Sequence, residues 1–279
     1  MIKISVIPNP TKDSGLTVTK KLIELLSGKA EIYMPDGYIT EPGVITVPEN
    51  EIYKCSDIVI VIGGDGTIIS SAVSCAENNT PLLGVNLGRI GFMSELEVSS
   101  LEEGVNRLLL GEYTEENRMM MDIEVIKKNG KRKLFHALND IVVQKTGKTK
   151  LIGIELFSGG EKISHYVADG LIVSTPTGST GYNFSAGGPV VNPLMSLYIT
   201  TAICPHMLSC RPAVMPAEQE LLIKADCEFD NHAEAVVDGE IVCELENGDE
   251  IKVTKSEYTT KLIKIVKRSF YDTLIEKLS

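Results

Sequence analysis

The sequence predicts an α/β domain with a parallel, Rossmann-like sheet, followed by a mostly antiparallel β-rich domain. In the first half, apolar strand patterns alternate with helical patterns, an order that builds a parallel sheet. After Asn117, strand patterns follow one another across short turns such as Asn129-Gly130, which is typical of antiparallel hairpins. We place the domains at 1–117 and 118–268, and expect a closing helix at 269–279 to pack back on the first domain.

The first half is expected to contain helices and strands of ordinary length, separated by turn residues. A stretch at 34–50 looks irregular because prolines and glycines interrupt it. In chain order we expect a strand at 2–7, a helix at 16–26, a strand at 58–62, a helix at 67–78, a strand at 82–85 and a helix at 100–110.

The second half is expected to consist mainly of hairpins. The expected strand pairs are 120–127 with 133–143, 151–157 with 161–167, and 235–237 with 240–244. Strands joined by such short turns pair in antiparallel fashion, so the second domain should be rich in antiparallel sheet.

Composition and charge exclude several classes of protein. The chain has 279 residues, of which 43% are hydrophobic, with no apolar run long enough for a membrane helix. Its net charge of −11 argues against a nucleic-acid surface. The N-terminus lacks the pattern of a signal peptide, and the cysteines show no C-x-x-C spacing that would indicate zinc. We therefore expect a cytoplasmic protein that binds neither nucleic acid nor membrane.

The chain is organised around a buried strand that runs into a glycine-rich turn. Five apolar residues, Ile58 to Ile62, precede Gly63-Gly64-Asp65-Gly66-Thr67. Glycines allow a bulky group to approach, and free amides at the start of a following helix favour phosphate. Asp65 would repel an anion, which indicates that it either holds a metal or accepts a proton from a hydroxyl that becomes phosphorylated. The simpler alternative is a tight turn capped by Asp65.

Two further polar segments need an explanation. Asn139-Asp140 interrupts an apolar strand pattern and is either a bulge or turn, or a pair of side chains suited to ribose hydroxyls. The stretch from Asp169 to Pro189 is rich in glycine and hydroxyl groups, with Tyr182 and Phe184 among them. We favour a ligand-binding role over a plain surface loop, because this mixture offers amides, hydroxyls and rings together.

Together these segments resemble the ATP-dependent NAD kinase family. The family's glycine-aspartate motif resembles Gly63–Thr67, its Asn-acid motif resembles Asn139-Asp140, and its third motif resembles the stretch from Asp169 to Pro189. The resemblance implies transfer of the γ-phosphate of ATP to the 2′-hydroxyl of the adenosine ribose of NAD, which gives NADP. It also implies that the second domain binds the dinucleotide and that Asp65 is the catalytic residue.

The resemblance also implies which residues bind the substrates. Phosphate is expected at Gly63, Gly64, Gly66 and Thr67. NAD is expected at Asp65, Gly66, Phe92, Asn139, Asp140, Lys150, Asp169, Thr177, Thr180, Gly181, Tyr182, Asn183, Phe184, Ser185 and Glu240. Positive charge near the phosphates would come from Lys145, Lys148 or Lys150, although an exposed basic face is the simpler explanation for any one of them.

The expected partners are small molecules and further copies of the chain. ATP would bring a divalent cation, for which we expect Mg²⁺, but the sequence assigns no metal ligand and indicates no tightly bound organic cofactor. The resemblance implies a homodimer or homotetramer. Two alternative functions stay open: a lipid kinase of the diacylglycerol type, and a non-catalytic dinucleotide-binding regulator.

Overall fold

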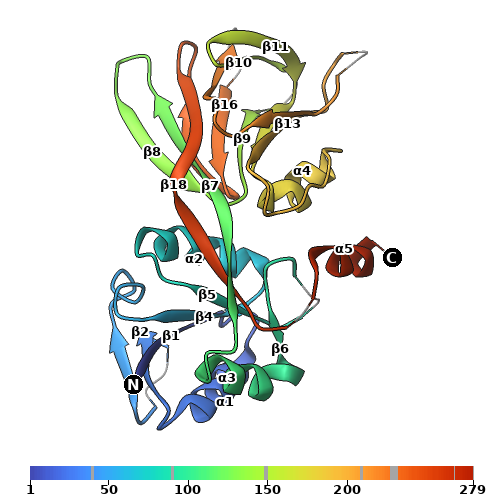
Figure 1. Cartoon of the computed structure of the whole chain (residues 1–279). Coiled ribbons are helices and arrows are strands. Elements are labelled where there is room, and N and C mark those ends of the chain that lie inside the picture. The colour runs from blue at the N-terminus through green and yellow to red at the C-terminus, as the bar shows by residue number, and fades with distance from the viewer. Residues whose placement is uncertain are drawn as a thin grey trace. The chain divides into compact units, whose positions relative to one another are not determined.

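The chain folds into two compact units. The computed structural model describes residues 1–38, 41–88, 91–147, 150–207, 210–226, 232–266 and 268–278. One unit contains Met1–Arg118 and Tyr258–Ser279, and the other contains Met119–Glu257. Two long strands, β7 (Thr114–Ile126) and β18 (Glu250–Lys264), each contribute residues to both units, so the chain leaves the first unit along β7 and returns along β18 (Figure 1).

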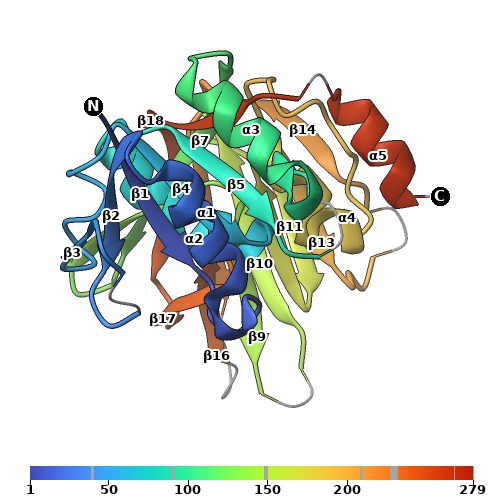
Figure 2. The same cartoon turned by 90° about the horizontal axis from the view of Figure 1, so that it is seen from below.

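The first unit is built on a parallel sheet with helices on both faces. Its strand order is β3-β2-β1-β4-β5, and every neighbouring pair is parallel. Helices α1 and α3 cover one face and α2 the other (Figure 1), and Figure 2 shows α1 and α3 side by side. The elements are β1 (Ile2–Pro8), α1 (Thr17–Leu26), β2 (Ala30–Pro35), β3 (Val44–Val47), β4 (Ile58–Gly63), α2 (Asp65–Glu77), β5 (Leu82–Asn86), β6 (Leu96–Glu97), α3 (Leu101–Leu109) and α5 (Phe270–Leu278).

Strand β4 is an interior strand of this sheet, between β1 and β5. All six of its residues are buried, and its Ile and Val side chains pack under helices on both faces, which explains the uninterrupted apolar sequence. In the pairing register Pro8 lies opposite Ile62, and Gly63 lies opposite Asn86. The carboxyl ends of β1, β4 and β5 therefore coincide, and the segments that follow them emerge at one edge of the sheet.

The expectation of an irregular stretch at 34–50 was wrong in part. Strand β3 forms within it and pairs with β2, whose last residues also fall in this stretch. Only four residues long, β3 is the edge strand of the sheet and is half-exposed. It therefore lacks the continuous apolar run by which a central strand is recognised.

The second unit is dominated by antiparallel strands, which confirms the predicted fold class. A six-stranded sheet has the order β14-β13-β12-β9-β16-β17. Outside it, β7 pairs with β8, and β10 pairs with both β11 and β15. The elements are β8 (Arg132–Ala137), β9 (Asp140–Thr146), β10 (Ile152–Ser158), β11 (Glu161–Ala168), β12 (Gly170–Ser174), α4 (Tyr182–Ser185), β13 (Leu197–Ile203), β14 (Ala213–Pro216), β15 (Leu221–Asp226), β16 (His232–Val237) and β17 (Glu240–Leu245).

The strand expected at 133–143 is divided in two. Strand β8 ends at Ala137 and pairs with β7, whereas β9 begins at Asp140 and pairs with β12 and β16. The backbone N–H groups of Leu138 and Asn139 donate to the Asp238 carboxylate instead of to a neighbouring strand. The polar pair thus marks the point where the chain passes from one sheet to the next.

Candidate functional site

In the first unit, the loops after β1, β4 and β5 meet at the carboxyl edge of the sheet. The loop after β4 is the single residue Gly64, and α2 begins at Asp65 with its first N–H groups at this edge. Helix geometry leaves the first amides of a helix without intrahelical partners, and here the N–H groups of Asp65 and Gly66 precede the bonds that Thr67 and Ile68 N–H donate to the Gly64 carbonyl oxygen. Anionic groups are stabilised at such a helix start, so this edge is suited to phosphate.

Asp65 is held by the loop that follows β5. Its carboxylate accepts hydrogen bonds from the backbone N–H of Phe92 (2.8 Å) and of Met93 (3.2 Å). The side chain is half-buried, and its charge acts on the buried guanidinium of Arg118. Burial lowers the pKa of Arg118, while the carboxylates of Glu116 and Asp65 act in the opposite direction. Asp65 is therefore a fixed acceptor with an oriented carboxylate.

Two glycines make room for this arrangement. A Cβ at Gly91 would lie 1.8 Å from Oδ1 of Asp65, and a Cβ at Gly63 would lie 2.4 Å from Oγ1 of Thr67. Neither distance is compatible with a side chain. The absence of a Cβ at Gly91 is what lets the loop approach the carboxylate closely enough to donate two amide hydrogen bonds.

Gly91→Ala is expected to lower kcat about 100-fold, because the methyl group would displace the Asp65 carboxylate from its two amide donors. The matched control is Gly88→Ala in the same loop, where a Cβ would meet no atom within 4 Å. Steady-state kinetics of both variants provide the measurement. Equal activities would show that the close contact at Gly91 has no influence on the site.

A lysine that sequence reasoning missed lies against the glycine turn. Nζ of Lys12, in the loop after β1, is 2.8 Å from the position that a Cβ would occupy at Gly64. Lys12 is exposed and forms no ion pair within the described part of the chain. The side chain of Asn9 orders its loop by accepting hydrogen bonds from Thr11 and Lys12 N–H and by donating one to Thr67 Oγ1 (2.8 Å). The turn is thus flanked by a cation that forms no ion pair with a described carboxylate.

In the second unit, Asn139 and Asp140 border a cavity of about 380 Å³. Its lining residues come from β9 and the residue before it, from the end of β16 and the turn after it, and from the start of α4, and they include Tyr182 and Asp238. Oδ1 of Asn139 is buried without a hydrogen-bond partner within the described chain. Such a cavity, with a few polar groups on an otherwise apolar lining, is typical of a small-molecule site.

Asp238 fixes the backbone of the Asn139-Asp140 pair. Its carboxylate accepts hydrogen bonds of 2.8–2.9 Å from the backbone N–H groups of Leu138, Asn139 and Asp140. Its own N–H donates to the Asp140 carbonyl oxygen at 3.0 Å. Asp238 has a φ of +49°, a left-handed conformation that is uncommon outside glycine and asparagine. Sequence reasoning missed this residue, which lies in the turn between the strands expected at 235–237 and 240–244.

The loop predicted between Asp169 and Pro189 packs directly against the same pair. Thr175 donates from its N–H to the Asn139 carbonyl oxygen (2.8 Å) and from Oγ1 to the Leu138 carbonyl oxygen (2.5 Å). A Cβ at Gly178 would lie 2.3 Å from the Asn139 carbonyl oxygen, so the approach needs a glycine. The structure therefore brings two separately predicted segments together.

Within that loop, some side chains are buried and stabilise the loop, and others are exposed. Asn183 is buried, and its amide bonds to Ser179, Pro189 and Thr201, so it stabilises the loop rather than facing a ligand. Tyr182 and Phe184 are instead about 40% exposed. Thr177 is buried, whereas Thr180 and Gly181 are half-buried and Ser185 is exposed.

The carboxyl group of Asp140 sits in an unusual electrostatic environment. The residue is 6% exposed, and burial, together with the neighbouring charge of Asp238, raises its pKa to about 7. Burial also raises the pKa of Asp238, against the effect of its three amide donors. Perturbed carboxyl groups on a cavity wall are characteristic of functional sites.

Comparison with known proteins identifies the family of this chain. Residues 4–113 match the family model of the ATP-NAD kinase N-terminal domain, and residues 138–265 match that of the ATP-NAD kinase C-terminal domain. The chain belongs to the ATP-NAD kinase family. The resemblance inferred from the three motifs is thereby confirmed, and both candidate regions lie within the matched segments.

Full-length relatives and solved structures agree with this membership. The NAD kinase of Natranaerobius thermophilus is 38% identical over 288 residues, covering 100% of this chain and 98% of the relative. That of Lachnoclostridium phytofermentans is 36% identical over 286 residues, covering 99% of each. A crystal structure of yeast NADH kinase complexed with NADH superposes with a TM-score of 0.89 at 25% identity, covering 100% of this chain and 87% of that one. An NAD kinase from Archaeoglobus fulgidus in complex with ATP gives a TM-score of 0.76 at 25% identity, covering 99% and 98%.

The remaining residues predicted for this ATP-NAD kinase occupy varied positions. Lys145 forms an ion pair with Asp169 (2.5 Å), so each neutralises the other. Lys150 is exposed, and Lys148 lies outside the described residues. Glu240 is exposed at the start of β17 and is not among the residues that line the cavity. The positive charge expected from lysines 145–150 is thus partly cancelled within the second unit, and in the first unit Lys12 is a cation beside the glycine turn.

Proposed function

We propose that the protein transfers the γ-phosphoryl group of ATP to the 2′-hydroxyl of the adenosine ribose of NAD, which gives NADP and ADP. As a member of the ATP-NAD kinase family, the chain is an NAD kinase. The observation that carries the mechanism is the oriented Asp65 carboxylate at the start of α2, beside phosphate-compatible amides. A site that only bound phosphate would exclude a carboxylate at this point.

Asp65 is the group that accepts the proton of the ribose hydroxyl. As the bond between O2′ and the γ-phosphorus forms, the bond to the bridging oxygen of ADP breaks and the O2′ proton passes to Asp65. Phosphoryl transfer depends mainly on alignment and charge neutralisation, so a carboxylate of fixed orientation suffices. The amides of Phe92 and Met93 supply that orientation.

We assign the phosphates of ATP to the glycine turn and the dinucleotide to the residues around the second-unit cavity. Gly63, Gly64, Gly66 and Thr67 keep the first turn of α2 open to phosphate. Asn139 and Asp140 face ribose hydroxyls, with Tyr182 as the ring of that cavity. The other members of the dinucleotide set are Gly66, Phe92, Lys150, Asp169, Thr177, Thr180, Gly181, Phe184, Ser185 and Glu240; Asn183 contributes by shaping the loop.

Magnesium enters this scheme as part of the substrate. The described residues contain no group of three or more His, Cys, Asp or Glu side chains placed to hold a metal. We propose that a divalent cation arrives bound to the ATP phosphates, whose oxygens are its preferred ligands.

Lys12→Met is expected to lower kcat/KM for ATP about 100-fold, because it removes the unpaired cation beside the glycine turn. Lys12→Arg should retain most of the activity, since the charge is kept. Lys20→Met on α1 is the matched control, an exposed lysine on the helix that covers one face of the sheet. Kinetics with varied ATP provide the measurement, and an unchanged KM and kcat in Lys12→Met would refute the assignment.

A coupled assay for NADP formation from NAD and ATP tests the proposed function itself. NADP should form only when both substrates are present. Phosphorylation of diacylglycerol without NADP formation would support a lipid kinase, and NAD binding without turnover would support a regulator.

In the described chain no helix is long and apolar enough to cross a membrane. We further propose a cytoplasmic homodimer or homotetramer, which size-exclusion chromatography of the purified protein would test for subunit number.

A further inference from the structure

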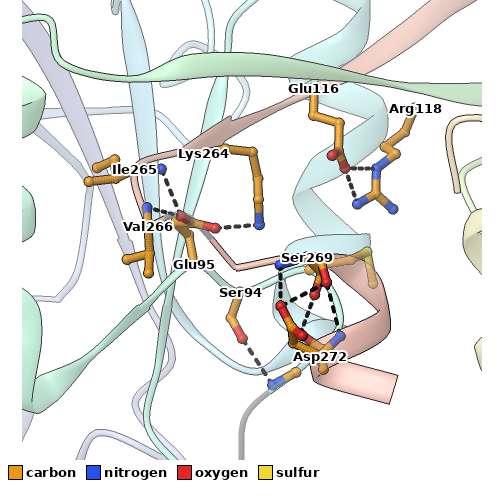
Figure 3. A network of polar contacts seen from close by, with 12 residues as sticks. Ser94, Glu95, Glu116, Arg118, Lys264, Ile265, Val266, Ser269 and Asp272 are labelled. Carbon is orange, nitrogen blue, oxygen red and sulfur yellow. Dashed lines mark hydrogen bonds and ion pairs between the residues drawn. The ribbon is translucent and has the colours of Figure 1, made fainter. Parts of the chain in front are cut away.

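The loop that holds Asp65 is fixed at its Glu95 end by the C-terminal part of the chain. Gly91 N–H donates to Oγ of Ser94 (3.1 Å), which tightens the loop. The buried carboxylate of Glu95 accepts hydrogen bonds from the N–H groups of Ile265 (2.7 Å) and Val266 (2.5 Å) and pairs with Lys264 (Figure 3). The end of β18 and the loop after β5 therefore form one network.

Helix α5 begins immediately after this network, and its start is well defined. Ser269 Oγ accepts a hydrogen bond from Asp272 N–H (3.1 Å), and the Asp272 carboxylate accepts from the N–H (3.0 Å) and Oγ (2.7 Å) of Ser269. This is a capping box, which fixes the direction in which the helix leaves the network (Figure 3). Arg268 adds an ion pair with Glu276, two residues before the end of α5.

The fixed helix brings two side chains onto the ring of Phe92. The ring of Phe270 lies 6.0 Å from that of Phe92, tilted by 41°, and Nζ of Lys277 lies 4.4 Å from the Phe92 ring centroid. Phe270 and Lys277 are seven residues apart, so they share one face of α5. An aromatic pair and a cation–π contact thus hold one ring.

Phe92, whose ring these contacts hold, is also the residue whose backbone N–H donates to Asp65. Phe92 N–H is the closer of the two amide donors, at 2.8 Å from Oδ2 of Asp65. A cavity of about 50 Å³ borders Phe92, Phe270 and Arg118, which provides space into which the ring would shift if its partners were removed. Movement of the ring would carry the amide with it.

We propose that α5 is a positioning element for catalysis, in which Phe270 and Lys277 hold Phe92 so that its backbone N–H keeps the Asp65 carboxylate oriented. This rests on the proposed function, in which Asp65 accepts the ribose proton. The helix touches neither reacting atom; it acts through Phe92. Its loss should therefore slow the chemical step more than it weakens substrate binding.

The test compares variants of the full-length protein by kcat, KM for each substrate and thermal unfolding temperature. Phe270→Leu and Lys277→Met are each expected to lower kcat about 10-fold, with KM for ATP within twofold of the wild type. Lys277→Arg should restore kcat, because it keeps a cation over the ring. Ile275→Ala, on an exposed part of the same helix, is the matched control.

A double variant that also carries Asp65→Asn tests whether α5 acts by positioning Asp65 or by general support of the fold. If α5 acts through Asp65, adding Lys277→Met to Asp65→Asn should leave the residual rate unchanged, whereas independent effects would multiply. Lys277 is exposed, so its replacement keeps the test informative even if Phe270→Leu folds poorly. Unchanged kcat in Lys277→Met, or a further 10-fold loss in the double variant, would overturn the inference. A wild-type protein that forms no NADP would instead refute the proposed function.

Discussion

Replacement of Asp65 by Asn is expected to lower kcat by roughly 1,000-fold while leaving NAD affinity nearly unchanged. Proton acceptance by a positioned side chain typically contributes 10²–10⁴-fold, and a carboxamide cannot take up the ribose proton. Asn fills the same volume and keeps one oxygen that can accept from Phe92 or Met93 N–H, so the loop should stay in place. The measurement is kcat for NADP formation, with NAD binding followed separately by calorimetry.

The control for this variant is Asp36→Asn, which makes the same change of charge at an exposed position outside the site. Its kinetics should match those of the wild type. Loss of NAD affinity in parallel with kcat would contradict the role given to Asp65, because a proton acceptor contributes to the transition state and not to ground-state binding.

Much of the fold could be predicted because its signals are local. The interior strand β4 shows an unbroken apolar run, and hairpin turns such as Asn129-Gly130 show the residues that tight turns need. Strand β3 was not predicted because an edge strand has few buried residues and so gives a weak hydrophobic pattern. The division of the strand expected at 133–143 was not predicted for another reason. The carboxylate oxygens that accept its backbone N–H groups belong to Asp238, about 100 residues away in the sequence.

The candidate site was predictable in its glycines and acids but not in its supporting contacts. Asp65 stands out because a carboxylate among three glycines has no simple structural explanation. No sequence pattern distinguishes Lys12, Phe270 and Lys277, since an exposed lysine or a helical phenylalanine is common in any sequence. Their importance comes only from where the fold places them, beside Gly64 and around Phe92.

The two principal acids of this chain occupy contrasting environments. Asp65 is half-buried and accepts two backbone hydrogen bonds from the loop after β5. Asp140 is almost fully buried near a second carboxylate, which disfavours its charge. Placing a carboxyl group there therefore lowers the stability of the empty protein, an expected consequence of building a polar binding site into a folded core.

Asp140→Asn is accordingly expected to stabilise the unliganded protein at pH 8 while weakening NAD binding more than 10-fold. The pKa of Asp140 is about 7 when folded, against 3.8 as its ordinary value. Between these two values the folded protein keeps a proton that the unfolded chain has lost, so the free energy of unfolding falls as pH rises from about 4 to 7. Removing the ionisable group should recover about 2–4 kcal/mol at pH 8 and nothing below pH 4.

Denaturant unfolding at pH 4 and pH 8 measures the first effect, with Glu161→Gln, an exposed carboxylate in the same unit, as the control. For binding, an ionised carboxylate accepts hydrogen bonds from ribose hydroxyls more strongly than a neutral one. KM for NAD in the wild type should therefore fall as pH rises through 7, and this dependence should vanish in Asp140→Asn. A variant that is less stable than the wild type at pH 8 would show that the buried charge is compensated by contacts on which the fold depends.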